Sequence, residues 1–139
     1  MQLIIFGSGR WAYEICKEAI KFTQLSKIIL ITNNKEAKLK FAIFKKKISF
    51  YKFLSSDIIK KKSKIIICNS AENHFKALKK FINLKNDILI EKPLFDNIKH
   101  LKILKFKKNI FFSRVFAFDY YLNSFSNRIN KSILSKVNI

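Results

Sequence analysis

Short, unbroken apolar runs rich in β-branched residues alternate along this chain with longer stretches of helical periodicity. This alternation is typical of βαβ units built around a parallel sheet. The runs do not alternate polar with apolar residues, so we expect strands that are covered by helices on both faces. We therefore predict an α/β fold, a single domain with a doubly wound parallel sheet in three layers. The expected strands are Leu3–Phe6, Ile28–Ile31, Ile48–Tyr51, Ile65–Cys68, Ile88–Ile90 and Ile110–Phe118.

Apolar residues at three- and four-residue steps predict helices after three of these strands. Asp96 or Asn97 is placed to cap the third helix, and a short helix is expected within residues 52–62. The three stripes are Ala12, Ile15, Cys16, Ala19 and Ile20; Phe75, Leu78, Phe81 and Ile82; and Ile98, Leu101 and Leu104.

Both glycines of the chain stand directly after the first apolar run, in the segment GSGRWA at residues 7–12. The segment matches the pattern G-x-G-x-x-G/A in its required setting, after a buried strand and at the start of a helix. There the first glycine makes a tight turn, the second lets the backbone approach a pyrophosphate, and the helix amino end offers N–H groups. A plain strand-to-helix turn is the alternative. The motif predicts a Rossmann-like dinucleotide site that includes Gly7, Ser8, Gly9, Arg10 and Trp11.

Unusual polar residues follow three other expected strands directly. They are Thr32-Asn33-Asn34, Asn69-Ser70 and Glu91-Lys92-Pro93. In an open parallel sheet these loops all emerge at the carboxyl ends of the strands, where ligands of this architecture bind. We therefore expect the four stretches to meet at one crevice.

Three segments of the chain, IIFGSGRW, IIICNSAENHFKALKKFI and DILIEKPLFD, occur in this order. In order and spacing they resemble the N-terminal domain of the Gfo/Idh/MocA oxidoreductases, the glucose-fructose oxidoreductase and inositol dehydrogenase family, from the start to about Phe118. The resemblance implies a Rossmann domain over residues 1–119 that binds NAD or NADP, with residues 120–139 leading toward a second domain. It carries cofactor-binding roles to Gly7, Gly9, Asn69, Ser70, Glu91, Lys92 and Pro93.

The resemblance also implies that Lys92 is catalytic, beside the nicotinamide and the reacting carbon of a sugar-like substrate. The cofactor would carry the hydride, and Lys92 would handle the proton or polarise the carbonyl. Glu91 would hold the ammonium or the loop, and Pro93 could fix the turn through a cis bond. His74 matches a histidine common just inside the helix after the fourth strand; contact with the cofactor and a local packing or capping role are both open. The alternative for Lys92 is one more solvated lysine.

Two departures from the family pattern bear on function. NAD sites usually have an acidic residue about 20 residues after the glycines, but here the sequence reads Thr32-Asn33-Asn34-Lys35; this tilts the expected cofactor weakly toward NADP. The substrate domain of the family is expected to be missing after Ile139. The alternatives are therefore a non-catalytic remnant, or a subunit that needs a separately encoded domain or a homo-oligomeric partner. An uncovered aromatic patch is then expected at Phe116, Phe118, Tyr120, Tyr121 and Phe125.

The formal net charge of +20 raises nucleic acid as a partner. Only Arg10, Arg114 and Arg128 among the 29 basic residues are arginines, whereas phosphate and base recognition favours the guanidinium group. Biased coding toward Lys, Ile, Asn and Phe explains the charge, so we expect no nucleic-acid partner. We also expect no membrane segment, no metal site, and a cytoplasmic protein whose two cysteines are buried thiols.

Overall fold

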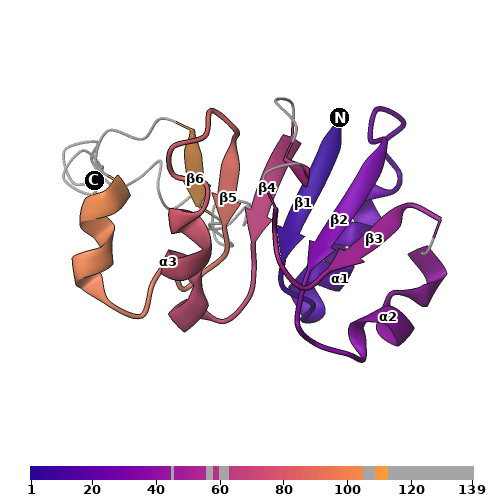
Figure 1. Cartoon of the computed structure of the whole chain (residues 1–139), viewed down its shortest axis with the longest axis horizontal. Helices are drawn as coiled ribbons and strands as arrows, with labels where there is room; N and C mark the ends of the chain where they lie inside the picture. Colours follow the sequence, from indigo (N-terminus) through magenta and orange to yellow (C-terminus); the bar gives the residue numbers. More distant parts are fainter. Residues whose placement is uncertain (45, 56–57, 60–62, 105–108, 113–139) are drawn as a thin grey trace, which may run out of the picture.

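The computed structural model describes residues 1–44, 46–55, 58–59, 63–104 and 109–112 of the chain. These residues form a sheet of parallel strands in the order β3-β2-β1-β4-β5-β6, drawn side by side in Figure 1. This is the doubly wound Rossmann arrangement, in which the strand order reverses between β1 and β4. The strands are β1 (Gln2–Phe6), β2 (Lys27–Ile31), β3 (Ile48–Tyr51), β4 (Ser63–Ile67), β5 (Ile88–Ile90) and β6 (Ile110–Phe112).

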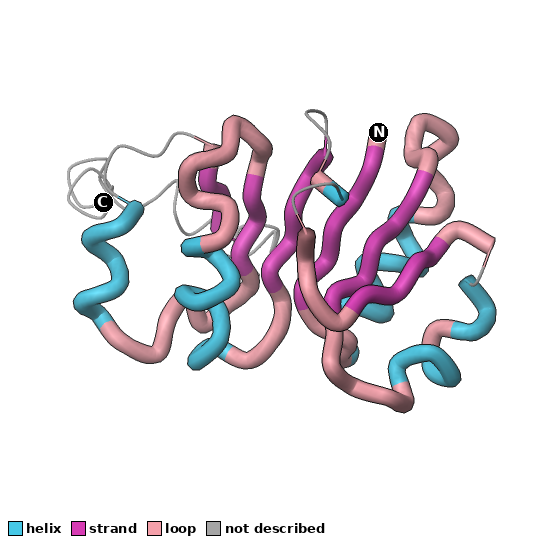
Figure 2. Tube along the Cα trace, viewed as in Figure 1, coloured by secondary structure: helices cyan, strands magenta, loops and turns pink. Residues whose placement is uncertain are grey.

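Helices cover the sheet on both faces and make three layers (Figure 2). On one face lie α1 (Arg10–Ala19), α2 (Ala37–Lys40) and the 3₁₀ helix η1 (Ala42–Phe44); on the other lie α3 (Ala71–Lys79) and the 3₁₀ helix η3 (Ile98–Leu104).

Alternate residues of the central strand enter two separate cores. Leu3 and Ile5 of β1 pack with the α1 face, whereas Ile4 and Phe6 pack with the α3 face. Because successive side chains of a strand point to opposite faces, a strand between two helical layers is mostly apolar, and its buried polar residues need partners, as Gln2 of β1 has in Ser63 of β4. All five residues of β1 are accordingly buried.

The strands match the sequence-based expectations closely, and so do the two helices expected after β1 and β4, which are α1 and α3. Ala12, Cys16 and Ala19 of α1 are buried, and Leu78 and Phe81 are completely buried after β4. Within the segment 52–62, where a short helix is expected, residues 52–55 form a bend and a loop and residue 58 is in a 3₁₀ turn; residues 56–57 and 60–62 lie outside the described residues. The apolar Leu54 of this segment packs directly against the α3-side core without a helix. Beyond Phe112, the expected strand residues, the connection 120–139 and the expected aromatic patch lie outside the described residues.

The third expected helix forms as η3, a 3₁₀ helix, and its predicted core stripe is only partly correct. Ile98 is 80% exposed, whereas Ile103 and Leu104 at the other end of η3 pack against the core. A 3₁₀ helix has three residues per turn, so the α-helical period does not describe its buried side. The expected cap is present at Asn97, whose Oδ1 accepts a hydrogen bond from the backbone N–H of Lys99 at 2.9 Å.

The described residues contain neither a helix that could cross a membrane nor a cluster of metal-ligating side chains. No helix among them has the length and apolarity needed to cross a membrane. Within the same ranges, no group of three or more His, Cys, Asp or Glu residues is placed to hold a metal ion.

Candidate functional site

Three backbone hydrogen bonds continue beyond the strands at the carboxyl edge of the sheet and join the ends of four neighbouring strands. The N–H of Gly7 donates to the carbonyl of Ile31 at 3.0 Å, and the N–H of Cys68 donates to that of Phe6 at 2.9 Å. The N–H of Glu91 donates to the carbonyl of Ile67 at 2.8 Å. The loops after β1, β2, β4 and β5 therefore emerge next to one another at the edge toward which the strand arrows point in Figure 1.

Gly7 is a glycine because the fold requires one. Its φ is +122°, a backbone conformation that side chains rarely adopt. A Cβ here would also lie 2.8 Å from the carbonyl oxygen of Cys68 and 2.9 Å from the backbone nitrogen of Asn69. The first glycine thus makes the tight turn that lets the β1 loop pass close to the β4 loop.

Gly9 is different, because nothing in the described part of the chain requires a glycine there. Its φ of −73° and ψ of −168° are available to any residue, and a Cβ would meet no atom within 4 Å. Gly9 is the N-cap of α1, so this open space lies at a helix end whose first N–H groups have no partner within the helix. A glycine here keeps the helix end open to close approach by an anionic group such as a pyrophosphate.

The residues after β2 form a hydrogen-bonded turn beside the glycine loop. The hydroxyl groups of Ser8 and Thr32 lie 2.8 Å apart, and the Thr32 oxygen accepts from the N–H of Asn34 at 3.1 Å. Asn34 Oδ1 accepts from the N–H of Glu36 at 2.9 Å. Lys40 of α2 reaches back to this point, with Nζ 3.4 Å from the carbonyl oxygen of Ser8. Thr32 and Asn34 thus shape the turn.

Two hollows flank this turn and share Thr32, Asn33 and Lys52 in their walls. One has a volume of about 370 Å³ and reaches from Gly7 and Asn69 to α3. The other, of about 390 Å³, lies over the ends of β2 and β3. Lysines line both hollows, which therefore suit an anionic ligand. These lysines are Lys52, Lys76 and Lys80 in the first hollow and Lys35, Lys38 and Lys52 in the second.

Asn69 places an unsatisfied amide oxygen at the first hollow. Its Oδ1 is buried and has no hydrogen-bond partner among the described residues, and Asn69 lines the hollow. A buried polar atom without a partner costs about 1–3 kcal/mol, so this oxygen fits a ligand that brings a hydrogen-bond donor. The next residue, Ser70, is the N-cap of α3, and its Oγ accepts from Asn73 Nδ2 at 2.8 Å.

The Glu91-Lys92-Pro93 loop follows β5 at the same edge. The Lys92–Pro93 bond is cis, in agreement with the possibility raised by the sequence. Glu91 Oε1 accepts from the backbone N–H of Lys92 at 3.2 Å, so one contact of this carboxylate is with its own loop. Glu91 is half-buried and Lys92 is exposed.

His74 lies inside α3 and is only 1% exposed. Its Nε2 lies 2.8 Å from the carbonyl oxygen of Asn69, and its Nδ1 lies 3.1 Å from that of Leu94. Both ring nitrogens therefore lie within hydrogen-bond distance of backbone carbonyl oxygens. The remaining motif residues, Arg10 and Trp11, are exposed at the start of α1.

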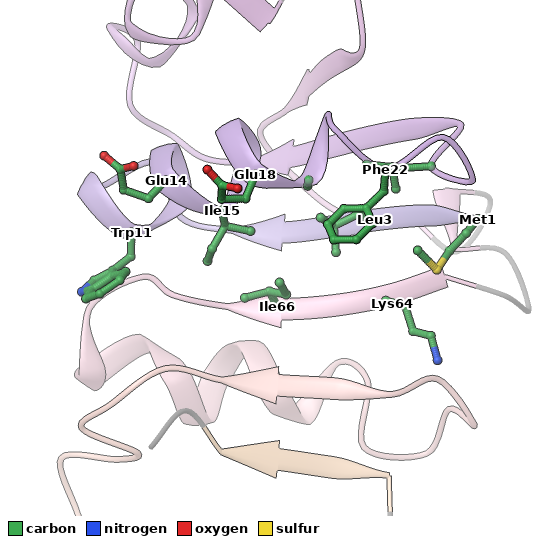
Figure 3. A pocket seen from close by; sticks show the side chains of 11 residues that line it. Met1, Leu3, Trp11, Glu14, Ile15, Glu18, Phe22, Lys64 and Ile66 are labelled. Atoms are coloured by element: carbon green, nitrogen blue, oxygen red, sulfur yellow. The ribbon is translucent and has the colours of Figure 1, made fainter. Parts of the chain in front are cut away.

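A further hollow, of about 500 Å³, extends from Trp11 along α1 and β4 and is lined almost wholly by apolar atoms. Figure 3 shows Ile15 and Phe22 of the α1 side and Ile66 of β4 around it, with the carboxylates of Glu14 and Glu18 along α1. An apolar wall flanked by carboxylates does not suit a pyrophosphate. We therefore place the candidate site at the two lysine-lined hollows.

The two thiols are chemically inert in this fold. Burial raises the pKa of Cys16 to about 12. Burial, and to a smaller extent Cys16 and Glu91, raise the pKa of Cys68 to about 12 as well. Cys68 directly precedes Asn69, but a thiol that stays protonated is no nucleophile.

Sequence reasoning missed the lysines and the bonding of His74. Lys52, Lys76 and Lys80 gave no signal among so many lysines, because only the fold shows which of them line a hollow. The helical stripe included Phe75, yet it said nothing of the adjacent His74. The partners of the His74 ring are the backbone carbonyls of Asn69 and Leu94, which the helical period does not reveal.

Comparison with known proteins identifies relatives of this domain. No match was found among curated proteins. Among solved structures, myo-inositol dehydrogenase from Lactobacillus casei, in complex with NAD(H) and myo-inositol, aligns with a TM-score of 0.75 and 16% identity over 96% of this chain and 42% of its own. UDP-N-acetylglucosamine 3-dehydrogenase from Acidithiobacillus ferrooxidans aligns with a TM-score of 0.68 and 13% identity over 93% of this chain and 42% of its own.

A third solved structure, a Gfo/Idh/MocA family oxidoreductase from Vibrio cholerae, aligns with a TM-score of 0.67 and 12% identity over 81% of this chain and 38% of its own. The chain thus spans about two fifths of the length of these proteins, and at such identities the likeness shows the fold. The GFO_IDH_MocA family model, described as "Oxidoreductase family, NAD-binding Rossmann fold", matches residues 1–109. Because that match covers most of the chain, this protein belongs to the Gfo/Idh/MocA oxidoreductase family and folds as its NAD-binding Rossmann domain.

Proposed function

We propose that this domain binds a nicotinamide dinucleotide at the carboxyl edge of the sheet, with the pyrophosphate against residues 7–9 and the amino end of α1. The observation that carries the proposal is Gly9, a glycine that the fold does not need and whose missing Cβ leaves open space. The lysine-lined hollows and the unsatisfied Asn69 Oδ1 support it. We also propose a cytoplasmic location, because two free buried thiols are in keeping with a reducing compartment.

We further propose that NADP(H) binds at least as tightly as NAD(H). The hollow over β2 and β3 is lined by Lys35, Lys38 and Lys52 and by no carboxylate. The nearest acidic residue along the chain, Glu36, is not part of its wall. Lysines at this position favour a ribose 2′-phosphate, whereas a carboxylate would favour the free 2′-hydroxyl.

The reaction we propose is hydride transfer on a secondary alcohol or carbonyl of a sugar, polyol or nucleotide-sugar. The names of the inositol dehydrogenase and of the UDP-N-acetylglucosamine dehydrogenase support this substrate class. The nicotinamide, when bound, supplies the hydride chemistry. Lys92 would hold or move the proton at the substrate oxygen. The Glu91 carboxylate would hold this loop by accepting a hydrogen bond from the backbone N–H of Lys92.

A second domain is part of this proposal. The matched dehydrogenases are more than twice as long as this chain, and a hydride transfer needs the substrate held in position as well as the cofactor. We propose that a substrate-binding domain or a partner subunit supplies that positioning. We expect little or no turnover without it.

Titration with NADPH and NADH tests the binding proposal. Trp11 is the only tryptophan of the chain and lies next to the glycine loop, so energy transfer from Trp11 to the reduced nicotinamide reports binding beside calorimetry. We expect binding of both cofactors, with NADPH at least as tight. A Lys35→Ala/Lys38→Ala variant should lose affinity for NADPH and keep that for NADH. Absence of binding at millimolar concentration would refute the site, and a strong NADH preference would refute the NADP proposal.

Lys92→Ala tests the catalytic role, in protein that turns over a polyol or sugar together with its substrate domain. We expect turnover to fall by about 10²–10⁴-fold, as when a positioned general acid or base is removed. Cofactor affinity should change little, because residues 7–9 and α1 hold the pyrophosphate. A wild-type protein that binds cofactor but transfers no hydride with any sugar-like substrate would favour a non-catalytic role.

A further inference from the structure

His74 bridges two of the loops that form the candidate site. One ring nitrogen contacts the carbonyl of Asn69, in the turn after β4, at 2.8 Å. The other contacts the carbonyl of Leu94, two residues after Lys92, at 3.1 Å. The imidazole is rigid, and its two nitrogens lie on different sides of the ring. The side chain therefore fixes the separation of these two carbonyls.

The chemistry of these contacts makes the bridge specific to histidine. Both partners are carbonyl oxygens, which only accept hydrogen bonds. A neutral imidazole has one N–H and donates to one of them, whereas the imidazolium donates to both. An apolar side chain of similar size would fill the space, but it would leave both carbonyls without this partner.

The two bridged loops have different parts in the site. Asn69 lines the hollow that reaches Gly7, on the side proposed to hold the pyrophosphate. Leu94 follows the Glu91-Lys92-Pro93 loop, proposed to meet the nicotinamide end. Displacing the Leu94 carbonyl from the Asn69 carbonyl would therefore move Lys92 relative to the bound cofactor.

We propose that His74 is a positioning residue, which sets where the Lys92 loop lies relative to the dinucleotide by holding the Asn69 and Leu94 carbonyls. The inference rests on the proposed dinucleotide function. It assigns His74 no contact with the cofactor, because the side chain is almost completely buried and both nitrogens are engaged.

The test compares two ligands on the His74→Ala variant, NADPH and 2′-phospho-ADP-ribose, which lacks the nicotinamide. We expect affinity for NADPH to fall about three- to tenfold, as for the loss of about one hydrogen bond, and affinity for 2′-phospho-ADP-ribose to stay unchanged. Added imidazole should restore part of the NADPH affinity by filling the vacated site. His74→Gln keeps one donor group and should therefore lose less affinity for NADPH. It replaces His74→Ala in the test if the alanine variant does not fold.

His100→Ala is the matched control. His100 is the other histidine of the chain; it stacks on Phe75 at 3.7 Å between ring centroids and packs edge-on against Phe95. His100 thus packs against Phe75 of α3 and Phe95 after β5, but it does not link the Asn69 and Leu94 carbonyls. We expect it to leave the ratio of the two affinities unchanged. An equal loss for both ligands in the His74 variants, or no loss for either, would overturn the inference.

Amide hydrogen exchange tests the bridge without any cofactor. In His74→Ala we expect faster exchange at residues 91–95 and unchanged exchange in β1 and β2, with reversal by imidazole. Unchanged exchange at residues 91–95 would refute the bridge even if wild-type protein bound neither ligand. Failure of wild-type binding with altered loop exchange would instead count against the proposed function alone.

Discussion

The two glycines of the GSG segment are only two residues apart, yet they are glycines for opposite reasons. Gly7 has a positive φ and no room for a Cβ, so the turn itself needs it. Gly9 has an ordinary φ and open space around its Cα. One glycine therefore serves the fold, and the other is free to serve a ligand.

Gly7→Ala should destabilise the protein by about 1–3 kcal/mol, because alanine at a φ of +122° is strained. Its Cβ would also press on the backbone of Cys68 and Asn69. Gly9→Ala is the matched control, and its effect on stability should stay within about 0.5 kcal/mol. Urea unfolding followed by circular dichroism measures both. Equal destabilisation by the two changes would contradict the assignment of separate roles.

The buried thiols give the protein a pH-dependent stability term at alkaline pH. Because burial raises the pKa of both to about 12, while an unfolded thiol titrates near about 8.5, the folded state holds these protons longer. Their stabilisation is complete below about pH 8.5 and is lost as the pH rises toward 12. Between pH 8 and 10 the free energy of unfolding should fall more steeply in wild type than in Cys16→Ala/Cys68→Ala. Parallel slopes would show that the thiols titrate normally.

At the residue scale, sequence reasoning identifies positions whose chemistry is unusual in the chain and misses those that depend on geometry. Gly7 and Gly9 were found because they are the only glycines, and Pro93 because it ends the Glu91-Lys92-Pro93 stretch that directly follows an expected strand. Lys52 and Lys80 look like every other lysine until the fold brings them to one hollow.

At the scale of elements, β-branched apolar runs predicted the strands well because a strand covered on both faces leaves few polar positions. β1 and β2 show this most clearly, since each contributes at least four consecutive buried residues. The segment around η3 was harder. Its three apolar residues at three-residue steps fit an amphipathic helix, but the chain forms a 3₁₀ helix whose contacts with the apolar core come from Ile103 and Leu104 at one end.

Two isoleucines test this difference between a buried strand and a mostly exposed helix. Ile90 of β5 is completely buried, whereas Ile98 of η3 is 80% exposed. Ile90→Ala should destabilise the protein by about 2–5 kcal/mol, and Ile98→Ala should stay within about 0.5 kcal/mol. Thermal or urea unfolding distinguishes the two. A large loss in Ile98→Ala would instead support the core-facing stripe predicted from the sequence.

At the scale of the whole molecule, the doubly wound topology creates the candidate site. Helices leave β1 and β4 toward opposite faces of the sheet, so the loops after these neighbouring strands part and leave a crevice between them. Part of the net charge of +20 is concentrated at this edge of the sheet. Lysines from several segments line two adjoining hollows there. Composition alone did not distinguish this arrangement from a general excess of lysine.

The central claim is that the space in front of Gly9 receives the pyrophosphate of a nicotinamide dinucleotide. Calorimetric titration of NADPH into wild type and Gly9→Val, with unfolding curves of both, tests it most directly. We expect saturable binding to wild type and no binding to Gly9→Val, which should remain folded because the new side chain enters open space. NADPH binding of equal affinity in both proteins would contradict it, as would the absence of binding to wild type.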